Sequence, residues 1–121
     1  MSHRVLVVDD EPNIVISLEF LLKKEGYVVA VAGDGEAALE QAGQFLPDLV
    51  LLDVMMPKKS GFEVCETLRA NPAHAGVKIV MLTARGRETE VTKGLALGAD
   101  AYITKPFSTK DLVARIKTLL G

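Results

Sequence analysis

Five short apolar runs alternate with amphipathic segments along the chain, and this alternation predicts the fold. Each run is short enough to be a strand, and its nearly continuous apolar character is typical of a strand buried on both faces. The runs occupy Val5–Val8, Val28–Ala32, Leu49–Leu52, Val77–Leu82 and Ala101–Thr104.

The segments between these runs carry helix start and stop signals. Pro12 suits the first turn of a helix, and Asp34 suits an N-cap. Ser108 with Asp111 three residues later resembles a capping box, and Gly98 is a natural left-handed terminus. We therefore expect five helices, from Pro12, from Asp34 to before Pro47, from about Ser60 to before Pro72, over roughly Glu88–Leu97 and from Ser108.

Alternating strands and helices with short connections predict an α/β fold, a parallel sheet covered by helices on both faces. Five units are too few for a closed eight-stranded barrel, so we expect an open, doubly wound (βα)5 sheet. Such sheets bind ligands beyond the carboxyl ends of their strands, where the strand order reverses. Candidate chemistry is therefore sought at those ends.

Acidic residues follow two of the predicted strands. Asp9 and Asp10 follow the first, and Asp53 follows the third. If these strands are neighbours, three carboxylates converge, and each like-charge pair ~4 Å apart costs about 4 kcal/mol at an effective dielectric constant near 20. A cation or a bound proton must offset this repulsion, and an all-oxygen ligand set favours Mg²⁺.

Two further polar residues, Thr83 and Lys105, close the fourth and fifth predicted strands. Taken singly, each candidate has a plain structural interpretation: Asp10 as a helix cap, Asp53 as a turn residue, Thr83 as strand filler and Lys105 as a solvated lysine. Their occurrence together at one end of four strands favours a functional site.

Composition adds limits. The chain of 121 residues, with 49% hydrophobic residues, is predicted to form one domain over residues 1–121. Its net charge of −2 argues against direct nucleic-acid binding. No apolar run approaches the ~20 residues of a membrane span, and no signal peptide is evident. Cys65 is the only cysteine, so the chain has no internal disulfide, and we expect a cytoplasmic location. We expect Cys65 itself to be a buried core residue.

The strand-end motifs VVDDEP, LLDVMMPKKSG, MLTA and GADAYITKPF occur in this order. Together they resemble the CheY-like receiver domain of two-component response regulators, over essentially the whole chain. The resemblance implies a flavodoxin-like fold with strand order 2-1-3-4-5. It also implies a signalling switch that promotes only its own phosphorylation and dephosphorylation and is not otherwise an enzyme.

By this resemblance Asp53 is the phosphoacceptor. The donor would be a phosphohistidine of a sensor histidine kinase or a histidine phosphotransfer protein. Asp10 and Asp53 would ligate Mg²⁺ together with the backbone carbonyl of Met55, and Asp9 would act mostly through water. The chemistry is physically reasonable, because a carboxylate can be a covalent acceptor and phosphoryl transfer needs mainly positioning and charge neutralisation.

The resemblance assigns the switch to the other strand ends. Thr83 and Lys105 would hold the phosphoryl oxygens, and Tyr102 would turn inward as Thr83 moves. The Lys105–Pro106 bond is expected to be cis. The predicted helix at Glu88–Leu97 has few apolar residues, so we expect the surface around it and the fifth strand to change. That change would regulate an effector, fused or separate.

Three features depart from the family pattern or leave alternatives. Receivers can form phosphorylation-dependent homodimers through charges on the last two helices and last strand; Val91 and Ala101 stand where charge is expected, which puts that dimer in doubt. Met55 and Arg85 occupy positions that tune the lifetime of the phosphorylated state. Ile16 and Phe20 either dock a kinase or pack against the final helix, and we favour packing.

Rival functions fit less well. A flavodoxin-like FMN carrier needs a phosphate-binding loop after the first strand, but the loop here is acidic. A Mg²⁺-dependent phosphatase with an aspartyl nucleophile, of the haloacid-dehalogenase type, could use Glu11 as its second acid, but the chain lacks room for a cap domain. A receiver that binds partners without phosphorylation would not need the complete acid set. His74 is expected to be solvated.

Overall fold

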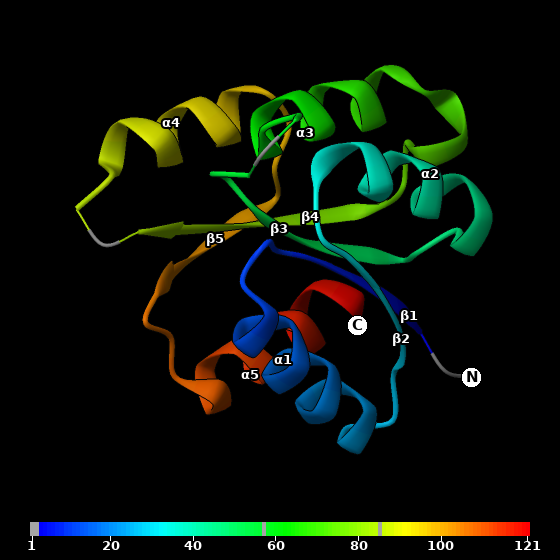
Figure 1. Cartoon of the computed structure of the whole chain (residues 1–121), viewed down its shortest axis with the longest axis vertical. Helices are drawn as coiled ribbons and strands as arrows, with labels where there is room; N and C mark the ends of the chain where they lie inside the picture. Colours follow the sequence, from blue (N-terminus) through cyan, green and yellow to red (C-terminus); the bar gives the residue numbers. More distant parts are fainter. Residues whose placement is uncertain (1–2, 57, 85) are drawn as a thin grey trace.

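The computed structural model describes residues 3–56, 58–84 and 86–121, and it shows strands and helices in strict alternation (Figure 1). The strands are β1 (Arg4–Val8), β2 (Val28–Ala32), β3 (Leu49–Asp53), β4 (Lys78–Ala84) and β5 (Ala101–Lys105). The helices are α1 (Pro12–Lys24), α2 (Gly35–Phe45), α3 (Gly61–Ala70), α4 (Glu88–Ala96) and α5 (Thr109–Leu120), with a short 3₁₀ turn at Pro72–His74.

The five strands form one parallel sheet in the order β2-β1-β3-β4-β5. Strand β1 pairs with β2 on one side and with β3 on the other, so the chain reverses its direction of winding between them. This confirms the predicted doubly wound fold and its strand order. The reversal puts the carboxyl ends of β1 and β3 side by side, where ligands bind in such sheets.

Helices cover both faces of the sheet, with α1 and α5 on one face and α2, α3 and α4 on the other (Figure 1). Alternate residues of each central strand enter opposite layers. In β1, Leu6 and Val8 pack in the layer of α2 and α3, whereas Val5 and Val7 pack in the layer of α1 and α5. This two-sided burial explains why the strand sequences are apolar without alternation.

The predicted helix starts are confirmed. Asp34 accepts a hydrogen bond from the backbone N–H of Ala37, Ser60 accepts one from Glu63, and Ser108 accepts one from Asp111. Asp10 does not cap α1: the N-cap is Glu11, which makes no side-chain capping bond. Strands β4 and β5 extend further than predicted at their carboxyl ends, because pairing continues through Thr83 with Thr104 and Ala84 with Lys105.

Two expectations about single side chains are wrong. Ile16 and Phe20 do not pack against the final helix; they are 64% and 71% exposed. Leu18 and Leu22 fill the layer under α1, and α5 contributes Leu112 and Ile116 to it. His74 is not solvated but only 7% exposed, because the turn at Pro72–His74 folds it inward. Cys65 is buried, as expected.

No helix within the described residues combines the length and the apolar character needed to cross a membrane.

Candidate functional site

The pairing of β1 with β3 brings Asp9 beside Asp53. Val8 is opposite Leu52 in the register, and the residues that follow them are Asp9 and Asp53. Asp9 is 1% exposed and Asp53 is 7% exposed, whereas Asp10 lies at the surface. The site therefore begins with two buried carboxylates at the carboxyl edge of the sheet.

Asp9, Asp10 and Asp53 each offer a carboxylate oxygen, and these oxygens lie within 4.8 Å of one another. Asp9 also shapes the loop, because its Oδ1 accepts a hydrogen bond of 2.9 Å from the backbone N–H of Glu11. The buried side chain that organises the start of α1 is therefore Asp9, and Asp10 is left facing the cluster.

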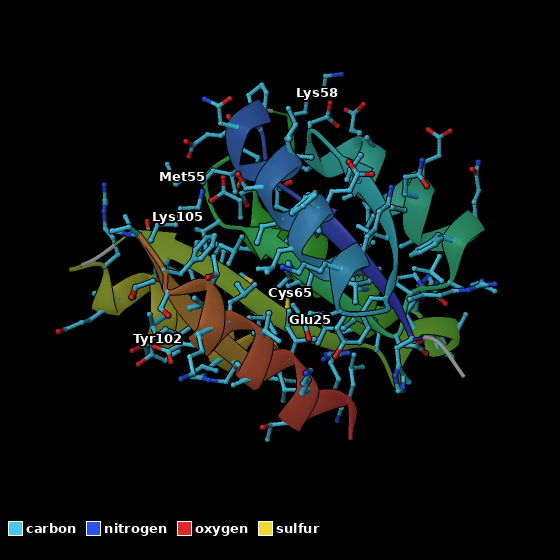
Figure 2. All side chains as sticks on the ribbon, turned by 90° about the horizontal axis from the view of Figure 1, so that it is seen from below. Glu25, Met55, Lys58, Cys65, Tyr102 and Lys105 are labelled. Atoms are coloured by element: carbon cyan, nitrogen blue, oxygen red, sulfur yellow. The ribbon has the colours of Figure 1, made fainter. Side chains whose placement is uncertain are left out.

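Lys105 at the end of β5 supplies positive charge to the cluster. Its Nζ lies 2.8 Å from Asp9 Oδ2, 3.2 Å from Glu11 Oε1 and 3.6 Å from Asp53 Oδ1. Figure 2 shows Lys105 and Met55 at the same end of the sheet. Burial alone would lower the pKa of Lys105, but contact with these carboxylates outweighs it, and the pKa is raised.

Asp53 is the most perturbed group of the site. Burial, followed by the negative charge of Asp9, raises the pKa of Asp53 to about 7, and Asp10 contributes in the same direction. The ammonium of Lys105 and the backbone N–H of Met55 lower it, but by less. The contacts of Asp53 with Lys105 and Met55 therefore do not offset the effects of burial and of Asp9.

The residues present fit a divalent cation. The converging donors are all carboxylate oxygens, which select a hard ion such as Mg²⁺, and Asp10 keeps one side of the cluster open to water. Burial first, and then the charges of Asp9 and Asp10, disfavour the ionised form of Asp53 and raise its pKa. An ion of charge +2 at the cluster would favour the ionised carboxylates.

Thr83 lies across the site on β4. It is 1% exposed, and its Oγ1 has no hydrogen-bond partner among the described residues. Thr83 lines a cavity of about 310 Å³ together with Asp53 and Lys105. A buried hydroxyl without a partner is costly, so a ligand that accepts its hydrogen bond would be favoured there.

A glycine permits the close packing behind Asp53. Gly61, the first residue of α3, donates a backbone hydrogen bond of 2.9 Å to the carbonyl of Val54. A Cβ atom at Gly61 would collide with the backbone carbonyl oxygen of Asp53. The absence of a side chain thus allows the start of α3 to lie directly against the strand end that carries Asp53.

The remaining predicted residues occupy different environments. The Met55 side chain is 65% exposed, so it does not point into the cluster; the implied metal ligand is its backbone carbonyl. Tyr102 is 39% exposed, and its carbonyl accepts a hydrogen bond of 3.3 Å from Arg115 Nη1. The Lys105–Pro106 bond is cis, as expected. Arg85 lies outside the described residues.

Two acids were not singled out as parts of this site. Glu11 contacts Lys105, and Glu90 of α4 lines the cavity that holds Asp53. The sequence position of each could have predicted its place at the site. Glu11 continues the acidic run after the first strand, and Glu90 lies in the first turn of the helix that follows Thr83.

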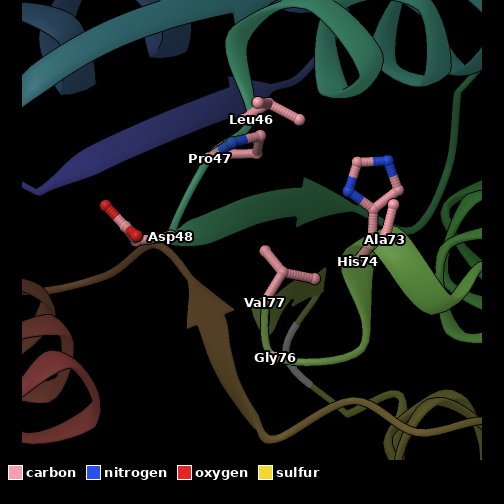
Figure 3. A pocket seen from close by; sticks show the side chains of 7 residues that line it. All are labelled: Leu46, Pro47, Asp48, Ala73, His74, Gly76 and Val77. Atoms are coloured by element: carbon pink, nitrogen blue, oxygen red, sulfur yellow. The ribbon is translucent and has the colours of Figure 1, made fainter.

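A second cavity, of about 340 Å³, lies between the loops that precede β3 and β4 (Figure 3). Leu46, Pro47 and Asp48 form one wall, and His74 forms part of the other. Because these loops lead into the amino ends of the strands, this cavity is at the opposite edge of the sheet from the acidic cluster.

The fold, the acidic cluster and the strand-end threonine and lysine define a class of protein. The family model of the response regulator receiver domain matches residues 5–117, and the chain belongs to this family. Response regulators of two-component systems interact with sensor kinases and effectors. The resemblance inferred from the motifs is therefore confirmed.

Particular relatives are similar over nearly the whole chain. The DNA-binding response regulator MtrA of Mycolicibacterium smegmatis is 48% identical over 120 residues, covering 99% of this chain and 51% of MtrA. The alkaline phosphatase synthesis transcriptional regulatory protein PhoP of Bacillus subtilis is also 48% identical over 120 residues, covering 99% of this chain and 49% of PhoP. The chain thus spans about half the length of these curated relatives.

Among solved structures, the chemotaxis response regulator CheY4 of Vibrio cholerae superimposes with a TM-score of 0.93 at 32% identity. The match covers 99% of this chain and 100% of that one. This similarity supports the CheY-like fold.

Proposed function

We propose that this chain is a phosphorylation-controlled switch whose phosphoacceptor is Asp53. The observation that carries the proposal is the position of the Asp53 carboxylate. It is buried at a strand end, beside two other acids, and lines one cavity with Lys105 and an unpartnered Thr83 hydroxyl. Such a cavity offers groups for positioning a phosphoryl group and for balancing its charge.

In the proposed step, a carboxylate oxygen of Asp53 forms a bond to phosphorus while the bond from phosphorus to the donor's histidine nitrogen breaks. The electron pair of that bond leaves with the imidazole. Lys105 is within reach of Asp53 and can follow the new phosphoryl oxygens, at the expense of its contacts with Asp9 and Glu11. The product is an acyl phosphate that water can hydrolyse, so the switch resets without the chain acting as an enzyme on another substrate.

Mg²⁺ is the proposed cofactor. Asp10, Asp53 and the backbone carbonyl of Met55 would hold it, with Asp9 acting mostly through water. When bound, the ion neutralises charge on the phosphoryl oxygens and on the carboxylates. The carboxylate cluster and the raised pKa of Asp53 support this assignment.

Thr83 and Tyr102 are the proposed relay to the surface. The Thr83 hydroxyl would donate to a phosphoryl oxygen, which would satisfy its missing hydrogen bond. Tyr102 is partly exposed on β5 and would bury as Thr83 moves. Phosphorylation would in this way bias the surface formed by α4 and β5 and change its affinity for a partner.

The partners follow from the same proposal. A sensor histidine kinase or a histidine phosphotransfer protein would supply the phosphoryl group. The names of MtrA and PhoP describe DNA-binding and transcriptional regulators about twice this length, so we propose an effector, fused or separate, as the target. Direct nucleic-acid binding by residues 1–121 is not part of the proposal. The cytoplasmic location stays a prediction.

Intact-mass spectrometry after incubation with acetyl phosphate and Mg²⁺ tests the proposal. We expect one base-labile phosphate per chain, because acyl phosphates hydrolyse in alkali. The phosphate should be lost in Asp53→Asn and when Mg²⁺ is chelated. A base-stable phosphate, or one retained in Asp53→Asn, would overturn the assignment.

A further inference from the structure

Glu90 is a further acidic residue that lines the phosphoacceptor cavity. It lies in the first turn of α4, its side chain is only 16% exposed, and it lines the cavity together with Asp53, Thr83 and Lys105. Glu88 belongs to the same turn but is exposed and does not line the cavity. The two glutamates therefore differ in environment while sharing charge, helix and turn.

The positive charge nearest to Glu90 compensates its negative charge only weakly. The Arg87 Nη1 lies 3.7 Å from Glu90 Oε2, but the Arg87 side chain is 59% exposed, so solvent screens this ion pair. The cavity lysine, Lys105, is already shared among Asp9, Glu11 and Asp53. A phosphoryl group on Asp53 would therefore add negative charge to a cavity that the acidic residue Glu90 also lines.

The two ends of α4 are held differently. At its carboxyl end, Arg69 Nε donates a 2.8 Å hydrogen bond to the carbonyl of Gly98, and Arg69 Nη2 pairs with Asp100 Oδ2 at 2.7 Å. At its amino end, the N-cap residue Arg87 makes no side-chain capping bond. Gly94 is the only buried residue of α4. The first turn, which carries Glu90, is the end with less to hold it in place.

We propose that Glu90 is a positioning residue that couples the charge on Asp53 to α4: like-charge repulsion opposes phosphorylation and, once Asp53 is phosphorylated, displaces the first turn. The inference rests on the proposed function of Asp53 and adds how that site is regulated. Because Arg69 fixes the far end of the helix, the displacement is a rotation about Gly98 rather than a translation of all of α4.

A comparison of four proteins tests the proposed role of Glu90: wild type, Glu90→Gln, the matched control Glu88→Gln, and Asp53→Asn. The first readout is the initial rate of phosphorylation by acetyl phosphate with Mg²⁺. Removing the cavity carboxylate should raise the rate about five-fold, and this gain should shrink at high ionic strength. Glu88→Gln, with the same change in net charge, should stay within about two-fold of wild type.

The second readout is amide hydrogen exchange with and without phosphorylation. In wild type and in Glu88→Gln, phosphorylation should speed exchange in the first turn of α4 but not around Gly98. In Glu90→Gln that increase should be lost. A purely structural role for Glu90 would change exchange in the unphosphorylated chain and leave the salt dependence of the rate unaltered, which would overturn the proposal.

A second variant, Glu90→Met, removes the charge without leaving an amide. It should reproduce the effects of Glu90→Gln, and a gain in only one of the two variants would contradict an electrostatic cause. Failure of this inference is distinct from failure of the proposed function. Equal rates in wild type, Glu90→Gln and Glu88→Gln reject the role of Glu90, whereas no phosphate on wild type, or phosphate on Asp53→Asn, rejects Asp53 as acceptor.

Discussion

Asp53 combines two properties that usually exclude each other in a side chain. It is buried, which disfavours its charge, yet the Lys105 ammonium and the backbone N–H of Met55 favour the ionised carboxylate. The conflict appears as a pKa raised to about 7. A site with this much stored repulsion responds strongly to any positive charge that enters it.

The first prediction concerns stability and pH without metal. Because the pKa of Asp53 is raised from 3.8 to about 7 in the folded chain, folding retains a proton that the unfolded chain releases. The contribution of Asp53 to stability should therefore be greatest in acid and should fall as the pH rises through this window. The full shift corresponds to roughly 4 kcal/mol, and solvent screening reduces our expected loss to about 1–2 kcal/mol.

Urea unfolding in EDTA at about pH 5 and about pH 8 measures this loss. Asp53→Asn, which cannot ionise, should show a flatter pH dependence. Added Mg²⁺ should stabilise wild type more at the higher pH than at the lower one. An Asp53→Asn slope equal to that of wild type would show that another group is responsible.

The second prediction concerns Gly61. Substitution by alanine drives a Cβ against the backbone carbonyl of Asp53, so we expect a loss of about 2 kcal/mol in stability and slower phosphorylation. Gly43, in α2, has nothing within 4 Å of a built Cβ. Gly43→Ala should therefore stabilise the chain by about 0.5–1 kcal/mol and leave the rate of phosphorylation unchanged. Denaturant unfolding and acetyl phosphate kinetics report both effects.

At the scale of elements, α1 carries an apolar flank beside the acidic cluster. Ile16 and Phe20 are largely exposed, and a groove of about 300 Å³ lined by Ile16, Asp9 and Asp10 joins this flank to the site. In the proposed function a phosphohistidine donates to Asp53, so this flank is where we expect a kinase or phosphotransfer protein to dock. The alternative of packing within the chain is excluded by the exposure of both side chains.

The third prediction follows from this flank. Phe20→Ser should lower phosphotransfer from the cognate kinase by about ten-fold, since an exposed aromatic anchor is lost, while phosphorylation by acetyl phosphate stays unchanged. Leu46→Ser removes another exposed apolar side chain at the opposite edge of the sheet and should affect neither reaction. Equal transfer rates for wild type and Phe20→Ser would place the docking surface elsewhere.

The fourth prediction concerns the connection of α3 to the end of α4. Arg69 donates hydrogen bonds to the carbonyls of Gly98 and Val77 and pairs with Asp100. Arg69→Met removes these three contacts and leaves Asp100 Oδ2 with only the backbone N–H of Ile79 as a donor. We expect a loss of about 2 kcal/mol in the free energy of unfolding. Arg115→Met, which removes an exposed arginine with one hydrogen bond of 3.3 Å, should cost less than about 0.5 kcal/mol. Urea unfolding compares the two.

At the scale of the molecule, the fifth prediction is the oligomeric state. The charges expected for a dimer through α4, β5 and α5 are incomplete, because Val91 carries no charge and Ala101 is both uncharged and buried. We expect the phosphorylated chain to remain monomeric at micromolar concentrations. Lys93, Asp111 and Arg115 are the residues that do fit the charge pattern of that dimer. Sedimentation velocity before and after phosphorylation tests the expectation, and a phosphorylation-dependent dimer would show that these three charges suffice.

The fold was accessible from local signals. Unbroken apolar runs indicate strands buried on both faces. Caps such as Asp34 and Ser60 act through hydrogen bonds to residues only three positions further along the chain. Such signals lie within a few residues, so a single sequence is enough to predict the five strands and five helices. The candidate site needed more than local signals: the strand ends marked its residues, but the pairing of the first and third strands, which brings Asp9 and Asp53 together, was implied by the family resemblance.

The sequence by itself thus determined the βα order, the sheet and the edge at which Asp9, Asp53, Thr83 and Lys105 meet. Only the tertiary structure decided how deeply each side chain is buried and which ones are neighbours across the fold. It exposed Phe20, buried His74 and brought Glu90 to the cavity of Asp53. Burial depends on what packs from distant parts of the chain, and electrostatic coupling depends on distances across the fold, so neither can be read from local pattern.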